Sequence, residues 1–283
     1  MASQFQYEKD YSFEFFPPRS PDAEERLTST SRDLAELNPL FFSVTFGAGG
    51  TTRQKTRETV IELKKRTGIE SAPHISCIGS SQSSIRRIIH DYRDQGIRRI
   101  VALRGDLPSG MREIGEFRYA NELVEFIRME TGDYFQIDVA AYPETHPQSQ
   151  NIEADLKNFK RKVEAGANGA ITQYFYNPDA YFRFVDSCHK NGLDIPIVPG
   201  IMPIGNFFQI SRFSEACGAE IPRWMRKRFE YYADDRDSIQ AFGIDTVSTL
   251  CQTLLDNDAP GIHFYTMNRS DLVRKIWNRL DIK

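Results

Sequence analysis

The sequence predicts a closed (β/α)8 barrel, and three observations support this fold class. Eight short runs rich in β-branched and aromatic residues recur, segments with helical periodicity separate them, and no linker or low-complexity tract divides the 283 residues. Eight alternating units in roughly 250 residues are typical of a parallel barrel that closes on itself. We therefore expect a single domain over residues 1–283.

The expected elements alternate along the whole chain. Ser20 before Pro21 and Asn177 before Pro178 predict helix starts, because an N-cap residue followed by a first-turn proline is favoured there, and Gly68 predicts a helix end. The expected strands lie in the segments 11–18, 41–47, 71–78, 97–105, 135–143, 169–176, 194–201 and 261–268. The interval after the seventh strand is too long for one helix and predicts three, in the segments 206–218, 221–232 and 237–255.

Composition excludes several classes of protein. The net charge of -3 and the pI near 6.0 provide no basic surface for nucleic acid, so small molecules are the expected partners. The four cysteines lack metal-site or disulfide spacing, which predicts neither zinc nor disulfides and fits a reducing compartment. No apolar run is long enough to span a membrane, and no signal peptide is expected. We expect a cytoplasmic protein that forms a homo-oligomer.

The stretch FEFFPPR at residues 13–19 places a carboxylate, Glu14, among phenylalanines. On its own, this stretch favours a solvent-facing position for Glu14 on the strand, between inward phenylalanines. However, active sites of barrels gather at the carboxyl ends of the strands, and nearly every expected strand ends in polar side chains. These are Glu14, Thr45, His74, Arg104, Asp106, Tyr142, Glu144, His146, Gln173, Tyr265, Asn268 and Arg269. We therefore expect a functional Glu14 at a polar barrel mouth.

Several chemistries are disfavoured at this mouth. The five histidines lack HxH or HExxH spacing, which argues against a catalytic metal, and no strand ends on a lysine that could form a Schiff base. The segment GAGGTT at residues 47–52 lacks the pattern of a P-loop, although its glycines would allow a ligand to approach the backbone closely.

The segment at residues 151–168 predicts an amphipathic helix beside the mouth. Ile152, Leu156, Phe159 and Val163 share one face, which we expect to pack on the barrel. A second face carries Asp155, Asn158, Arg161 and Lys162. This face is either solvated or holds a nucleotide cofactor, with the two cations on a pyrophosphate and the other two side chains on hydroxyl or amide groups.

Taken together, these motifs resemble those of the methylenetetrahydrofolate reductases, flavoproteins that make 5-methyltetrahydrofolate. In order along the chain, the motifs are FEFFPPR, SVTFGAGG, APHISCI, VALRGD, AAYPETHP, DLKNFKRKVEAGAN, AITQYF, VPGIMPI and HFYTMNR. The resemblance spans all eight expected strands, so residues 1–283 would form the catalytic barrel. It implies bound FAD, with NADH or NADPH as reductant. Leu107 departs from the family pattern, since many members have a proline there.

The resemblance also implies roles for individual positions. It implies that Glu14 is the general acid and that Asp106 lies beside the flavin and the folate. The positions implied to contact FAD are Thr45, Phe46, Ala48, His74, Arg104, Gly105, Asp106, Tyr119, Ala120, Tyr142, His146, Ser149, Asp155, Asn158, Arg161 and Lys162. The positions implied on the substrate side are Thr45, Asp106, Gln173, Gln209, Phe213 and Arg269.

The implied reaction explains a carboxyl group in this place. Opening the five-membered ring of 5,10-methylenetetrahydrofolate requires a proton on N10, after which reduced flavin can deliver hydride to the exposed carbon. The flanking Phe13, Phe15 and Phe16 are expected to desolvate Glu14 and favour its protonated form. Two alternatives stay open, namely another flavin-dependent barrel oxidoreductase with a different substrate and a non-catalytic flavin or folate binder.

Overall fold

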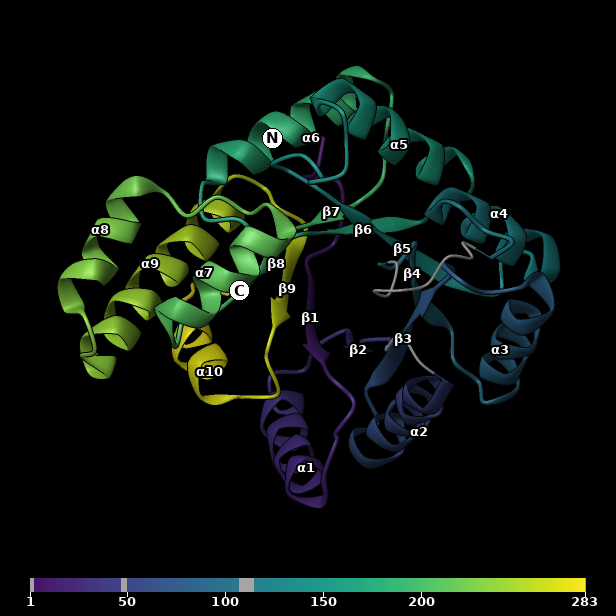
Figure 1. Cartoon of the computed structure of the whole chain (residues 1–283), viewed down its shortest axis with the longest axis horizontal. Coiled ribbons are helices and arrows are strands. Elements are labelled where there is room, and N and C mark those ends of the chain that lie inside the picture. The colour runs from purple at the N-terminus through teal and green to yellow at the C-terminus, as the bar shows by residue number, and fades with distance from the viewer. Residues whose placement is uncertain (1–2, 47–49, 107–114, 283) are drawn as a thin grey trace.

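The computed structural model describes residues 3–46, 50–106 and 115–282 and shows an α/β barrel of the TIM type (Figure 1). In the described residues all strand pairs are parallel, in the order β7-β6-β5-β4-β3-β2-β1-β9-β8. The strands are β1 (Asp10–Phe15), β2 (Phe41–Val44), β3 (Glu70–Ser76), β4 (Arg99–Leu103), β5 (Gln136–Ala141), β6 (Gly169–Thr172), β7 (Ile197–Val198), β8 (Gly200–Ile201) and β9 (Gly261–Tyr265).

The barrel closes at Pro199, the single residue between β7 and β8. β7 pairs with β6, whereas β8 pairs with β9, so the two ends of the sheet meet at neighbouring residues of the chain. The prediction of one continuous seventh strand is therefore wrong, because the structure divides it in two. Proline has no N–H group to donate to a strand ladder, but its carbonyl can still accept. Here the Pro199 carbonyl accepts the His263 N–H at 3.0 Å.

Helices cover the outside of the strands, as the sequence predicts. They are α1 (Pro21–Ala35), α2 (Gly50–Thr67), α3 (Gln82–Asp94), α4 (Ala120–Thr131), α5 (Ile152–Glu164), α6 (Pro178–Lys190) and α10 (Asp271–Trp277). Both predicted caps are confirmed, since Ser20 accepts the Ala23 N–H before α1 and Asn177 accepts the Asp179 N–H before α6. These local signals fix where the two helices begin.

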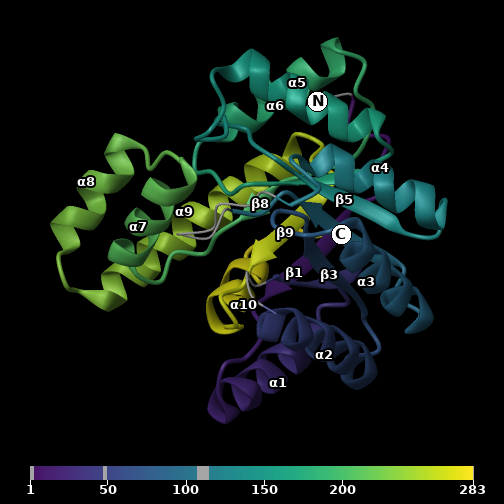
Figure 2. The ribbon, with the colours of Figure 1, turned by 45° about the vertical axis from the view of Figure 1, so that its right-hand side comes forward.

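Three further helices follow β8, which confirms the predicted insertion. They are α7 (Phe207–Cys217), α8 (Arg223–Tyr232) and α9 (Arg236–Asp256). Figures 1 and 2 show α8 as the outermost of the three, while α9 returns toward β9. α7 is thereby left beside the mouth of the barrel, where it can contribute side chains to a site.

Side chains alternate across each strand, and the outward ones form most of the apolar core. Phe13 and Phe15 of β1 are fully buried on this outer side. Phe13 packs on Phe42, Phe264 and Trp277, the last of which belongs to α10. One predicted core contact is wrong: Ile152 is 71% exposed at the start of α5, although Leu156, Phe159 and Val163 of the same face do pack on the core. The first turn of α5 extends beyond the barrel surface.

A charged cluster lies inside the barrel, among residues from the amino-terminal halves of the strands. Arg99 Nη1 lies 3.0 Å from Asp138 Oδ2 and 3.3 Å from Asp10 Oδ2, and its guanidinium group stacks 4.3 Å above the centre of the Phe41 ring. Burial raises the pKa of Asp10 to about 6, although the charge of Arg99 opposes the shift. We call Asp10, Arg99 and Asp138 the basal triad.

The basal triad predicts a measurable dependence of stability on pH. Because the pKa of Asp10 is higher in the folded state, protonation favours folding below the ordinary value near 4, and this contribution is lost as the pH rises through about 6. A folded-state pKa about two units above the ordinary value corresponds to about 3 kcal/mol of stability in all, of which about 1.4 kcal/mol is lost between pH 5 and pH 8. Asp10→Asn should remove this part of the pH dependence when the free energy of unfolding is measured in urea at pH 5 and pH 8.

Asp234→Asn provides the matched control, because Asp234 is exposed in the loop between α8 and α9. The control should keep the wild-type pH dependence. If Asp10→Asn kept it as well, burial of the Asp10 carboxyl would have no energetic consequence.

Candidate active site

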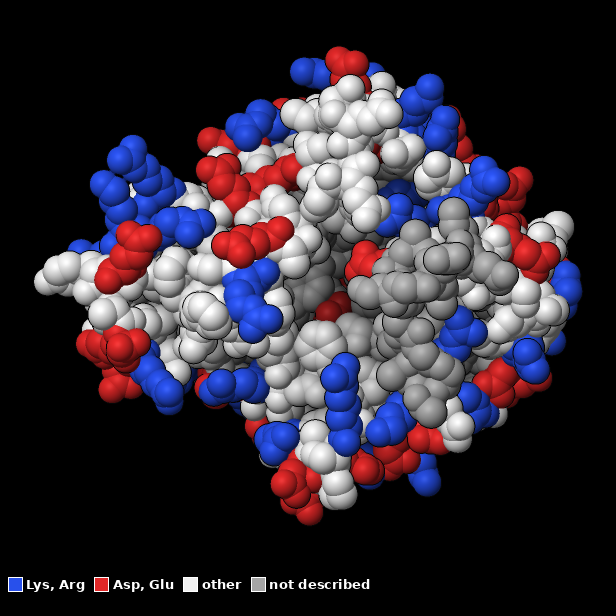
Figure 3. All heavy atoms as spheres, in the orientation of Figure 1, with Lys and Arg blue, Asp and Glu red and all other residues white. Residues whose placement is uncertain are grey.

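A cavity of about 690 Å³ opens at the carboxyl ends of the strands. Figure 3 shows it as a hollow in the middle of this face, with acidic side chains inside it. Predicted site residues from six strand ends and from α7 line this cavity: Glu14, Thr45, Phe46, His74, Gly105, Asp106, Tyr142, His146, Gln173 and Phe213. The structure therefore brings together side chains that are up to about 200 positions apart in the chain, as closed barrels do.

Among the described residues, the other positions implied to contact FAD or the substrate do not line the cavity wall. Ala48 and Leu107 lie outside the described residues. Arg104 donates to Gln148, which does line the cavity, and Tyr119 precedes α4 with half of its surface exposed. The remaining positions lie on α4 (Ala120), after β5 (Ser149), on α5 (Asp155, Asn158, Arg161, Lys162), on α7 (Gln209) and after β9 (Arg269). Their roles stay predictions.

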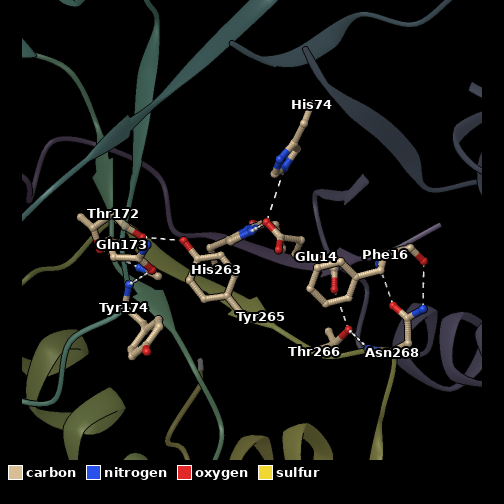
Figure 4. A network of polar contacts seen from close by, with 12 residues as sticks. Glu14, Phe16, His74, Thr172, Gln173, Tyr174, His263, Tyr265, Thr266 and Asn268 are labelled. Carbon is tan, nitrogen blue, oxygen red and sulfur yellow. Dashed lines mark hydrogen bonds and ion pairs between the residues drawn. The ribbon is translucent and has the colours of Figure 1, made fainter. Parts of the chain in front are cut away.

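Glu14 points from the end of β1 into the barrel, toward two histidines (Figure 4). Its Oε2 atom lies 3.4 Å from Nε2 of His74 and 3.8 Å from Nε2 of His263, and the Glu14 side chain is only 10% exposed. Both Nε2 atoms are buried without a hydrogen-bond partner among the described residues. On its other ring nitrogen, His263 shares a hydrogen bond of 2.7 Å with Ser12 Oγ.

The charge state of His74 follows from its burial. Desolvation lowers the pKa of His74 below its ordinary value, and the nearby Glu14 only partly opposes this shift. His74 is therefore neutral at pH 7, and it does not compensate a negative charge on Glu14.

The structure corrects the expected role of the phenylalanines around Glu14. Because neighbouring side chains of a strand point to opposite faces, Phe13 and Phe15 pack among the helices and do not surround the carboxyl group. Only Phe16, which is 39% exposed, lines the cavity. The carboxyl group is instead desolvated by the barrel interior and its two histidines.

Tyr265 crosses the barrel beside Glu14. Its hydroxyl donates to the Thr172 carbonyl at 2.7 Å, which links the end of β9 to the end of β6. The ring fits because residue 200 is glycine: a Cβ atom there would lie 2.7 Å from Cε2 and 2.8 Å from the hydroxyl of Tyr265. Burial raises the pKa of Tyr265 well above its ordinary value, so this tyrosine stays a hydrogen-bond donor at neutral pH.

Gly105 and Asp106 shape the wall next to β4. Gly105 has a φ of 83°, and a Cβ atom in its place would lie 1.8 Å from Ser76 Oγ. Only glycine satisfies both constraints, which allows the backbone after β4 to pass close to β3. The exposed Asp106 follows directly and places a carboxylate at the cavity wall.

The loop after β5 connects the cavity to α5. The Tyr142 and His146 rings meet edge to face at 4.5 Å, and the His146 N–H donates to Asp155 Oδ2 at 2.7 Å. Lys162 donates from Nζ to the Ala140 carbonyl at 2.5 Å, and burial lowers its pKa to about 8. The polar face of α5 is thus fixed against the loop, with Arg161 exposed next to Lys162.

The sequence reasoning missed His263, Ser12 and Arg53 as site residues. His263 lies in the middle of β9, so a search of strand ends passes over it, although alternation with Tyr265 shows that it faces inward. Ser12 precedes Glu14 by two residues on β1 and could have been found in the same way. Arg53 lines the cavity from α2 and donates to Ser80 Oγ at 2.9 Å, for which the sequence carries no signal.

Comparison with known proteins places this barrel in a family. The model of the methylenetetrahydrofolate reductase family matches residues 2–281. The chain belongs to this family. A 5,10-methylenetetrahydrofolate reductase from Pectobacterium carotovorum is 43% identical over 96% of this chain and 90% of its own length, and the protein of that name from Escherichia coli is 41% identical over 99% and 94%.

One more distant relative by sequence and one similar solved structure extend the comparison. Methylenetetrahydrofolate reductase (NADH) 1 of Arabidopsis thaliana is 35% identical over 91% of this chain but only 46% of its own length. A Clostridium thermocellum protein described as binding two copies of 5-methyl-5,6,7,8-tetrahydrofolic acid superposes with a TM-score of 0.65 and covers 98% of this chain and 96% of its own. At 15% identity, it supports the barrel fold alone.

Two further features of the described residues bear on the class of protein. No described helix is both long and apolar enough to cross a membrane. No cluster of three or more histidine, cysteine, aspartate or glutamate side chains with the geometry of a metal site occurs in residues 3–46, 50–106 and 115–282.

Proposed function

We propose that this chain reduces 5,10-methylenetetrahydrofolate to 5-methyltetrahydrofolate, with bound FAD and with NADH or NADPH as reductant. The family supports the substrate. The observation that carries the proposal is the position of Glu14, whose carboxyl group lies at the barrel-facing side of a large open cavity beside a neutral imidazole. A carboxyl group placed in this way can deliver a proton to a bound substrate.

Glu14 is assigned the proton transfer to N10 of the substrate. This transfer opens the five-membered ring, and it requires Glu14 to be protonated when the substrate binds. The Glu14 side chain is only 10% exposed, and the ring nitrogen 3.4 Å from it belongs to His74, whose pKa is lowered by burial. Positioned acid catalysis of this kind contributes about 10² to 10⁴ in rate.

The cavity and the residues beside it fit a flavin dinucleotide. Its volume of about 690 Å³ lies within the range of about 300 to 1,000 Å³ for ligand pockets. Gly105 lines the cavity wall, and Arg161 and Lys162 provide cations for a pyrophosphate. When bound, FAD would take hydride from the nicotinamide and pass it to the methylene carbon of the folate.

Asp106 is assigned to the folate side of the cavity. A carboxylate stabilises positive charge that develops when the ring of the substrate opens, whereas it would disfavour an anionic flavin. Gln173 is assigned to both substrates, because its side chain lines the cavity between β6 and α7, and its Oε1 already accepts the Tyr174 N–H at 3.0 Å.

A single preparation tests the proposed function against its two alternatives. We expect the purified protein to show a flavin spectrum, to be bleached anaerobically by NADH or NADPH, and to recover its colour when 5,10-methylenetetrahydrofolate is added. A protein that binds flavin but is not bleached would be a non-catalytic binder. A bleached protein that this folate does not reoxidise would be an oxidoreductase for another substrate.

A further inference from the structure

The turn after β9 is hydrogen-bonded to the end of β1, next to Glu14 (Figure 4). Thr266 Oγ1 donates to the Glu14 carbonyl at 2.5 Å. Asn268 Nδ2 donates to the Phe16 carbonyl at 2.9 Å, and Asn268 Oδ1 accepts the Phe16 N–H at 2.8 Å. The Asn268 carboxamide therefore pairs with both backbone groups of Phe16, as a neighbouring strand would.

A side chain is needed here because the regular strand pairing has ended. β9 ends at Tyr265, which pairs with Glu14, and the residues after Phe16 are Pro17 and Pro18, which have no N–H group to donate. A carboxamide carries one acceptor and one donor in a plane and so resembles a peptide unit. Aspartate could accept from Phe16 but could not donate to it, and a hydroxyl group is too short to do both.

The backbone of this turn is unusual. Met267 and Asn268 have φ values of 54° and 55°, in the left-handed region that residues other than glycine and asparagine seldom adopt. Such residues cost about 1 to 3 kcal/mol each and persist only where surrounding contacts fix them. Here the Asn268 N–H donates to Thr266 Oγ1 at 3.1 Å, and Thr30 Oγ1 donates to the Asn268 carbonyl at 3.2 Å.

We propose that Asn268 is a positioning residue for catalysis: its carboxamide fixes the end of β1, and thereby the carboxyl group of Glu14, relative to a bound folate. This inference rests on the proposed function. The strand carries Glu14 two residues before Phe16, so a freed Phe16 backbone would let the end of β1 move while the rest of the barrel stays closed. Displacing a catalytic group by about 1 Å can cost about 100-fold in rate.

The test separates the hydrogen bonds of Asn268 from its backbone conformation. Asn268→Gly keeps the left-handed conformation and removes both hydrogen bonds to Phe16, whereas Asn268→Asp keeps only the acceptor. In stopped-flow experiments we expect reoxidation by 5,10-methylenetetrahydrofolate to slow by about 10- to 100-fold in the glycine variant. We expect a smaller loss in the aspartate variant. Bleaching by NADH should stay within about twofold of wild type, since this step needs no proton from Glu14.

Asn168→Ala is the matched control at the other end of the barrel. Asn168 Oδ1 accepts the Ile137 N–H at 2.8 Å, so its removal also breaks a bond from a side chain to a strand. The control should lose stability without a selective loss of folate-dependent reoxidation. If Asn268→Gly slowed both half-reactions equally, slowed neither, or behaved like Asn168→Ala, Asn268 would be a structural residue only.

A measurement that does not depend on activity distinguishes this inference from the proposed function. Amide hydrogen exchange of Phe16, followed by NMR, should be at least about tenfold faster in Asn268→Gly than in wild type, because the N–H loses its acceptor. Unchanged protection would overturn the positioning role whatever the kinetics show. Wild-type flavin that folate does not reoxidise would overturn the proposed function instead.

Discussion

Glu14→Gln should abolish most of the folate half-reaction and leave the nicotinamide half-reaction intact. Glutamine has nearly the same shape as glutamate but cannot supply a proton to N10, so reoxidation of the reduced protein by 5,10-methylenetetrahydrofolate should fall by about 10² to 10⁴. Flavin content and bleaching by NADH or NADPH should match wild type. Anaerobic stopped-flow absorbance measures the two half-reactions separately.

Glu70→Gln is the control for this experiment. Glu70 begins β3 at the opposite end of the barrel, where its Oε1 accepts the Arg98 N–H at 3.0 Å, and glutamine can still accept this bond. The control should keep both half-reactions. An equal fall of flavin reduction and folate reduction in Glu14→Gln would show that Glu14 positions the flavin and is not the acid.

Lys162→Met should weaken FAD binding by about 10- to 100-fold. Methionine keeps most of the apolar length of the lysine but removes a charge that we assign to the pyrophosphate, and a hydrogen bond to a charged group contributes about 1.5 to 3 kcal/mol. Fluorescence titration of the apoprotein with FAD measures the dissociation constant directly. Turnover per bound flavin should change little.

The pH dependence of FAD binding gives an independent result for the same residue. Burial lowers the pKa of Lys162 to about 8 in the protein without ligand, and a bound pyrophosphate would favour the charged form. FAD affinity should therefore be highest below pH 8 and fall as the pH rises toward 9.5, and this fall should be absent in Lys162→Met. Lys157→Met, on an exposed position of the same helix, should keep both the affinity and the fall. If the FAD affinity of Lys162→Met also fell as the pH rose, the pH dependence would belong to another titrating group.

Most of the fold could be predicted because its signals are local. Helix starts at Ser20 and Asn177, the apolar runs of the strands and the three helices after β8 all depend on a few neighbouring residues. The division of the seventh strand at Pro199 could not be predicted in the same way, because it depends on which strands β7 and β8 pair with across the closing sheet. The exposure of Ile152 depends equally on how far α5 extends beyond the barrel.

Some parts of the candidate site could likewise be predicted from the sequence, and others could not. Residues at strand ends, such as Glu14 and His74, could be predicted because the barrel topology alone brings them to one mouth. The surroundings of Glu14 could be predicted only in part: alternation along β1 and β9 turns Ser12 and His263 inward and the phenylalanines outward, whereas the position of Ser12 opposite His263 depends on strand register. Contacts made by loops, such as the pairing of Asn268 with Phe16, depend on backbone angles that residue types only weakly constrain.

The pairing of β1 with β9 has a consequence for how the protein is synthesised. Ser12 and His263 are 251 positions apart, so the strand that carries Glu14 keeps an unpaired edge until β9 has left the ribosome. Pairings between such distant segments form slowly, and an open strand edge is prone to join other chains in the meantime. The acid site would then form last, as the barrel closes, and catalytic activity would report completion of the fold.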